Sequence, residues 1–171
     1  AKVAGRRISV DNAEITPDPD VAALVELATR ETRNLRDSLI GTFAADYNKS
    51  YYSECCIGNL ITDAMRAETG AEIAIQNSGG IQGNIQAGDF TLGDLYTVMP
   101  FDNQLIQMTL KGSDLLDLLK LSASRQRGVL QVSGMRYAFK HKNSEDYHLK
   151  SALVGEAEID PNRLYMVATN N

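Results

Sequence analysis

The sequence predicts a single α+β domain in which helices flank a mixed β-sheet. Hydrophobic patterns typical of helices and of strands alternate along all 171 residues, without an internal repeat, a low-complexity tract or a domain linker. A hydrophobic content of 43% and a charged content of 23% are ordinary for a globular domain, and the length is enough to enclose one core. We therefore treat residues 1–171 as one domain.

Two long helices are expected in the first half of the chain. Asp18 before Pro19 is a candidate N-cap, and apolar residues at helical spacing extend this helix to about Leu39, with a charged face toward solvent. A stripe of apolar residues at i, i+3, i+4, i+7 and i+8 predicts the second helix over residues 56–68. Gly70 is expected to end it.

Two shorter helices are expected in the second half. Thr91 and Asp94 fit a capping box, which begins a helix through Val98. Pro100 prevents this helix from continuing. The next helix begins at residue 112 and carries Leu115, Leu116, Leu118 and Leu119.

The remaining apolar segments are predicted to be short strands of the sheet. Gly134 interrupts one of them. The predicted strands lie at residues 7–10, 40–44, 72–76, 105–110, 129–139, 150–158 and 164–169.

The charge balance limits the kinds of partner that are expected, and the cysteines bear on the redox compartment. Seventeen basic against 22 acidic residues give a net charge of −5, which argues against a nucleic-acid-binding surface. No membrane span is expected, and residues 1–7 are too few and too polar for a signal peptide. Adjacent cysteines such as Cys55 and Cys56 rarely reach disulfide geometry, so the redox compartment stays open.

The sequence shows no catalytic residue, metal ligand set or cofactor motif. His141 and His148 are expected in an exposed loop, whereas a dinuclear hydrolytic site needs several His, Asp and Asn ligands. Cys55 and Cys56 border an apolar helix, a setting typical of buried structural thiols. Only a Cys–His pair brought together by folding is left open. Ser78 does not lie in a G-x-S-x-G motif, and no phosphate-binding loop is present.

The segment from Asn77 to Gln82 is the best candidate for a binding site. A strand that ends in Asn before Gly79 and Gly80 lets the backbone approach a ligand and present its N–H groups. The alternative, which spacing alone favours, is a tight turn with a structural role. Phe101 is the second candidate: past a helix end, it either fills the core, as the sequence alone favours, or stacks on a ligand.

A series of motifs follows in order from residue 54. They are E-x-x-x-G-N-L-x-x-D-A at 54–64, N-x-G-G-I at 77–81, T-x-G-D with V-x-P-F within 91–101, L-x-G-x-x-L at 110–115 and L-Q-V-S-G at 130–134. Together they resemble the C-terminal domain of the 5'-nucleotidase, UDP-sugar hydrolase and 2',3'-cyclic-nucleotide phosphodiesterase family. The resemblance implies the fold of that domain.

The resemblance also implies a function. The chain would be the nucleotide- or nucleoside-recognition domain of a phosphohydrolase. A metallophosphoesterase domain with two divalent metal ions, in cis or on a separate chain, would perform the chemistry. Phe101 would stack on the base, Asn77 would contact the nucleoside, and the helix with Asn59 and Asp63 would support the pocket. Family members are commonly secreted, periplasmic or surface-anchored, which implies an extracytoplasmic location.

The sequence departs from the family pattern at two arginines, which fall on Gln82 and at about Tyr51. A charge-assisted contact to phosphate contributes about 1.5–3 kcal/mol, against about 1 kcal/mol for a neutral hydrogen bond. The family's second stacking aromatic and its G-G-D-G segment would follow Asn171, so we expect a domain truncated before its last segment. The alternatives are a degenerate binding or interaction module without nucleotide affinity, and an independently active enzyme.

Overall fold

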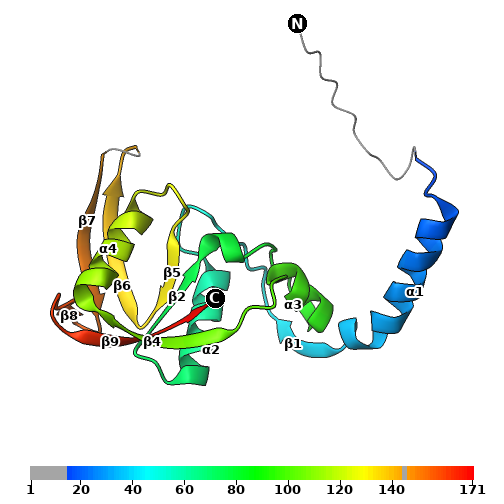
Figure 1. The fold of residues 1–171 in the computed structure, drawn as a ribbon, viewed down its shortest axis with the longest axis horizontal. Coiled ribbons are helices and arrows are strands. Elements are labelled where there is room, and N and C mark those ends of the chain that lie inside the picture. The colour runs from blue at the N-terminus through cyan, green and yellow to red at the C-terminus, as the bar shows by residue number, and fades with distance from the viewer. Residues whose placement is uncertain (1–14, 144–145) are drawn as a thin grey trace, which may run out of the picture.

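The structure, a computed structural model, describes residues 15–143 and 146–171 (Figure 1). The strand predicted at residues 7–10 lies outside this part of the chain. The helices are α1 (Pro19–Arg36), α2 (Cys56–Thr69), α3 (Leu92–Val98) and α4 (Gly112–Ala123), with a 3-10 turn, η1, at Ser78–Gly80. The strands are β1 (Leu39–Phe43), β2 (Ile73–Asn77), β3 (Gly88–Thr91), β4 (Leu105–Lys111), β5 (Leu130–Ser133), β6 (Met135–His141), β7 (Tyr147–Val154), β8 (Ala157–Glu158) and β9 (Leu164–Asn170).

A four-stranded mixed sheet forms the centre of the fold and confirms the predicted α+β class. Its strand order is β4-β9-β2-β5. β9 runs antiparallel to β4, with Gln107 opposite Ala168, and parallel to β2. β5 pairs antiparallel with the other side of β2. Two smaller antiparallel sheets, β1-β3 and β6-β7-β8, complete the strand pairing of the described residues.

Different helices cover the two faces of the central sheet. Consecutive residues of a strand point to opposite faces. Ile73 of β2 belongs to the buried cluster that contains Leu119 of α4, whereas the next residue, Ala74, packs with Met65 of α2. Met135 of β6 belongs to the same cluster as Leu119, so α4 packs against both larger sheets.

The loop before β9 satisfies the first backbone amides of α4. The Gly112 N–H donates to the carbonyl of Arg163 (2.8 Å), and the Ser113 N–H donates to that of Pro161 (3.0 Å). A Cβ at Gly112 would collide with the carbonyl oxygen of Asp160, so no larger residue fits without moving this loop.

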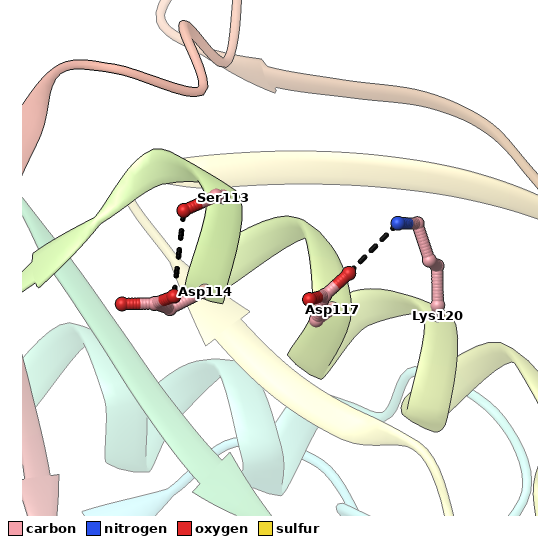
Figure 2. A network of polar contacts seen from close by, with 4 residues as sticks. All are labelled: Ser113, Asp114, Asp117 and Lys120. Atoms are coloured by element: carbon pink, nitrogen blue, oxygen red, sulfur yellow. Dashed lines mark hydrogen bonds and ion pairs between the residues drawn. The ribbon is translucent and has the colours of Figure 1, made fainter.

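The outer face of α4 is polar (Figure 2). The Ser113 hydroxyl donates to the carboxylate of Asp114 (3.4 Å), and the Lys120 ammonium contacts Asp117 (2.7 Å). Acidic groups near the start and a basic group near the end suit the helix dipole. Asp117 and Lys120 are both exposed, so this pair contributes at most about 1 kcal/mol.

A second buried cluster connects α2 and α3 with the small β1-β3 sheet. Phe43 of β1 meets Phe90 of β3 edge-on, with ring centroids 5.1 Å apart. The buried members of the cluster are Ile57, Ile81, Ile85, Phe90 and Val98. Because Ile81 and Val98 share it, the segment after β2 is packed against the end of α3.

Helix α1 extends away from the sheets (Figure 1). None of its residues is buried, and Val21, Leu24 and Val25 of its apolar stripe are 58%, 67% and 59% exposed. The helix ends at Arg36 and not at the predicted Leu39, because Leu39 begins β1.

Most predicted helix ends are confirmed. The Asp18 carboxylate caps α1 by accepting the N–H groups of Asp20 (3.0 Å) and Val21 (3.2 Å). Gly70 ends α2 in the left-handed conformation, with φ 66°. Thr91 begins α3 with the predicted capping box.

Several local predictions are wrong. Strand β3 was not predicted, and β7 begins at Tyr147, three residues earlier than expected. His141 and His148 lie on β6 and β7, because the pairing of these strands extends into the expected loop. Cys55 is buried, as expected, but Cys56 is exposed.

Candidate functional site

The segment after β2 forms a rigidly held turn. Asn77 is the last residue of β2, and η1 follows it directly. Ser78 is buried, and its hydroxyl donates to the carbonyl of Val129. The Gln82 N–H donates to the carbonyl of Val98 (2.8 Å). The turn is therefore fixed to the residue that precedes β5 and to the end of α3.

The two glycines of this turn make room for amide side chains. A Cβ at Gly80 would collide with the Gln76 side chain, whose Nε2 donates to Asn77 Oδ1 (3.0 Å). A Cβ at Gly79 would lie 3.4 Å from Asn77 Nδ2. Asn77 is exposed, and its Nδ2 donates to no group within residues 15–143 and 146–171. The turn thus presents a fixed amide with a free donor.

Both positions that the resemblance assigns to arginine lie at this turn. Gln82 is exposed, and its Nε2 donates to the carbonyl of Gly79 (2.5 Å). The ring of Tyr51 lies beside Gly79, where a Cβ would be 3.6 Å from its Cε2. A tyrosine ring and a neutral amide therefore occupy the place of two permanent positive charges.

Lys49 brings a positive charge to the turn, which the sequence motifs did not indicate. Its ammonium donates to the carbonyls of Gln82 (2.8 Å) and Ile81 (3.4 Å). Its backbone N–H donates to Asn84 Oδ1 (3.0 Å). The Lys49 ammonium contacts only carbonyl oxygens among the described residues, so its charge is not neutralised by a carboxylate there.

Phe101 stands at the surface and not in the core. Its side chain is 48% exposed, so the interpretation that the sequence alone favoured is wrong. It lines an apolar hollow of about 450 Å³ together with Ile61, Leu95, Tyr96 and Leu105. Asp102 and Asn170 add polar groups to this hollow, which is of the size that small ligands occupy.

The hollow and the turn are connected through the end of α3. Phe101 follows Val98 by three residues, and the carbonyl of Val98 accepts the N–H of Gln82. Asn77 and Gly79 do not line the hollow itself. The predicted site residues therefore lie in two adjacent features, the Asn77 turn and the Phe101 hollow. The hydrogen bond from the Gln82 N–H to the Val98 carbonyl connects them.

The residues present do not fit a metal centre. No group of three or more His, Cys, Asp or Glu side chains within the described part of the chain is arranged to hold a metal ion. His148 instead contacts Asp146 (3.3 Å) on the exposed β6-β7 hairpin. Residues 15–143 and 146–171 also contain no helix that is long and apolar enough to cross a bilayer.

The mixed sheet with helices on both faces and the order of the motifs agree with the C-terminal domain of 5'-nucleotidases. Residues 21–171 match the family described as the C-terminal domain of 5'-nucleotidase, so the chain belongs to this family. In its members the catalytic metal site lies in the N-terminal domain, whereas residues 21–171 match the C-terminal domain.

Known proteins agree with this assignment. Endonuclease YhcR of Bacillus subtilis (strain 168) is 30% identical over 167 residues, covering 96% of this chain and 14% of YhcR. Cell wall protein Lmo0130 of Listeria monocytogenes is 29% identical over 189 residues, covering 96% of this chain and 24% of Lmo0130. A crystal structure of a 5'-nucleotidase precursor from Thermus thermophilus superposes with a TM-score of 0.80 at 32% identity. The superposition covers 91% of this chain and 34% of the precursor chain. The chain thus spans between 14% and 34% of these proteins.

Proposed function

We propose that this chain is the nucleotide-recognition domain of a 5'-nucleotidase-type phosphohydrolase. The observation that carries the proposal is the exposed Phe101 ring in a hollow joined to the Asn77 turn, within a domain of this family. A metallophosphoesterase domain with two divalent ions, in cis or on a separate chain, would perform the hydrolysis. Residues 1–171 would act as one substrate-recognition domain.

Each site residue has a role in this proposal. Phe101 stacks on the base, and an aromatic–base contact contributes about 1–3 kcal/mol. The free Nδ2 of Asn77 donates to the nucleoside, while Gly79 and Gly80 let it approach the turn. Gln82 has no positive charge to offer a phosphate group, and the Lys49 ammonium provides that charge instead.

Isothermal titration calorimetry with adenosine, AMP and a UDP-sugar tests the proposal. At least one of these compounds should bind saturably to the chain. Phe101→Ala should weaken that binding by at least about fivefold, from the lower limit of the stacking contribution. Leu35→Ala, which removes an exposed apolar side chain from α1, is the control and should bind as the native chain does. Absence of binding by all three compounds would refute the proposal.

A degenerate binding or protein-interaction module is the alternative function. It is favoured by the Gln82 amide, which already bonds to the carbonyl of Gly79, and by the Tyr51 ring. Gln82→Arg distinguishes the two. A nucleotide-binding domain should gain affinity for AMP by about tenfold, because a charge-assisted contact is restored. A degenerate module should show no gain.

The same proposal includes an extracytoplasmic location. It is supported by the relative Lmo0130, which is named a cell wall protein. Fractionation of the native cells with an antibody against this chain tests it, and recovery of the protein only with cytoplasmic markers would refute it.

A further inference from the structure

A second cavity, of about 260 Å³, lies where the central sheet separates from the β6-β7-β8 sheet. The two sheets diverge at Gly134, which joins β5 to β6 with φ 77°. The residues of this cavity that matter here are Glu54, Arg125, Arg136, Tyr137 and Phe139. Its volume is just below the range of about 300–1,000 Å³ typical of sites for drug-sized ligands, so it has room for a smaller molecule.

One wall of the cavity is aromatic and fixed. Tyr137 and Phe139 lie on β6 with their rings stacked, at a centroid distance of 5.8 Å and an angle of 20°. The Tyr137 hydroxyl is bonded to Ser122 Oγ (2.7 Å) and donates to the carbonyl of Leu130 (2.9 Å). Burial raises the pKa of Tyr137, so this hydroxyl stays neutral at physiological pH. The wall is therefore aromatic and carries no negative charge.

Arg125 is held over this wall in an unfavourable conformation. Its guanidinium carbon lies 5.5 Å from the centre of the Phe139 ring. Its φ is 57°, in the left-handed region that residues other than glycine, asparagine and aspartate rarely adopt. Its Nε is buried and has no hydrogen-bond partner. Strained backbone conformations cluster at functional sites, and a buried polar atom without a partner is unusual in a native structure.

The charges around Arg125 leave it available for an anion. No carboxylate within residues 15–143 and 146–171 forms an ion pair with it, whereas Arg136 is paired with Glu156 (2.9 Å). Glu54 brings a carboxylate to the same cavity, held by a hydrogen bond from Asn59 Nδ2 (2.9 Å). The cavity thus combines one uncompensated cation, one carboxylate and an aromatic wall.

We propose that this cavity binds a small zwitterion of the aromatic amino-acid class. The ligand's carboxylate pairs with the guanidinium of Arg125, and its ammonium faces Glu54. Its ring lies against Tyr137 and Phe139. This cavity shares no lining residue with the Phe101 hollow and contains no residue of the Asn77 turn, although Val129 and Gln131 of its wall form hydrogen bonds with Ser78 of that turn.

Calorimetric titration of the full chain with L-phenylalanine tests the inference. Phenylacetate lacks the ammonium group and phenethylamine lacks the carboxylate, so both should bind at least about tenfold more weakly than phenylalanine. Saturable binding of phenylalanine with this ranking is the expected result. No saturable binding, or equal binding of either analogue, would overturn the inference.

Arg125→Gly separates binding from folding. Glycine relieves the left-handed φ, so the melting temperature of the variant should be unchanged or higher. Its affinity for phenylalanine should nevertheless fall by at least about tenfold. Arg127→Gly changes an exposed arginine of the same loop that does not line the cavity, and it should bind as the native chain does. Native affinity in Arg125→Gly would also overturn the inference.

Glu54→Gln tests the second charge. The variant should bind phenylalanine more weakly but phenylacetate no less tightly, because only phenylalanine has an ammonium group for the carboxylate to face. An equal loss for both compounds would show that Glu54 does not contact the ammonium and would refute the zwitterion assignment.

Discussion

The side chain of Gln131 occupies the space in which a Cβ of Gly58 would stand. Gln131 is buried, its Oε1 accepts the N–H of Cys55 (3.0 Å), and its Nε2 donates to the carbonyl of Ser53 (2.9 Å). Nε2 also donates to Ser78 Oγ (3.1 Å). One amide therefore holds together the start of α2, strand β5 and the turn that follows β2.

Gly58→Ala should destabilise the domain. Alanine is the better helix former, but its methyl group would displace Gln131 and break buried hydrogen bonds. We expect a loss of about 1–3 kcal/mol in the free energy of unfolding, measured by urea denaturation. Gly41→Ala is the control, because nothing lies within 4 Å of its added Cβ and its φ is not positive. A Gly58→Ala variant as stable as the control would contradict this account.

Gly134→Ala should destabilise more than Gly155→Ala. Both glycines have positive φ, 77° and 60°, so both substitutions carry the left-handed penalty of about 1–2 kcal/mol. Only at Gly134 would the added Cβ also collide with the carbonyl of Glu72 and approach Arg66 Nε to 2.8 Å. Chemical denaturation of both variants measures the difference, and equal losses would exclude the collision as a cause.

Thr91→Ala should lower the free energy of unfolding and make that free energy depend less on pH in the acid range. Hydrogen bonds from the Thr91 hydroxyl (2.7 Å) and N–H (2.9 Å) lower the pKa of Asp94. A carboxyl group whose pKa is lower in the folded state than in the unfolded state stabilises the fold when it is ionised. This stabilisation is complete above the unfolded pKa of about 3.9 and is lost as the pH falls through the folded pKa. Removing the hydroxyl should cost about 1 kcal/mol at neutral pH and less at pH 2, where the bond from the Asp94 N–H to the Thr91 hydroxyl is still lost but the contact with an ionised Asp94 no longer contributes.

Unfolding curves at several pH values measure this dependence. Asp89→Asn removes another exposed carboxylate near α3 and should keep the acid dependence contributed by the capping box. The interpretation fails if Thr91→Ala loses the same free energy at pH 2 as at neutral pH.

Lys49→Gln should distinguish a nucleotide from a nucleoside if the proposed function holds. The variant removes the charge beside Gln82, so the affinity for AMP should fall by about five- to tenfold while that for adenosine stays the same. Calorimetry with both compounds measures the difference, and Lys111→Gln is a control for loss of an exposed lysine elsewhere. Equal losses for AMP and adenosine would show that Lys49 does not contact the phosphate.

The helices could be predicted from the sequence because their signals are local. Gly70 and the Thr91–Asp94 box each act within one turn of their own helix. Strand β3 was missed because Gly88 and Asp89 are unfavourable in strands and only Phe90 is buried. Strand order was equally inaccessible, since no local pattern specifies that β9 pairs with both β4 and β2.

The candidate site was predictable only in part. The Asn77 turn is contiguous in sequence, so its motif identifies it directly. Phe101 lines a hollow whose walls come from α2, α3 and β4, and no short pattern encodes how these segments come together. The cavity at Arg125 was not predicted because Glu54 and Tyr137 reach it from segments far apart in the chain.

The position of β9 has a consequence for biosynthesis. Of the four central strands, Leu164–Asn170 is synthesised after the other three, yet it is inserted between β4 and β2 and carries the buried Tyr165 and Val167. The central sheet therefore cannot assemble while these residues are still inside the ribosome. Until they emerge, β4 and β2 have unpaired edges, which are prone to intermolecular association. A nascent chain stalled before Leu164 should depend on chaperones to remain free of aggregates.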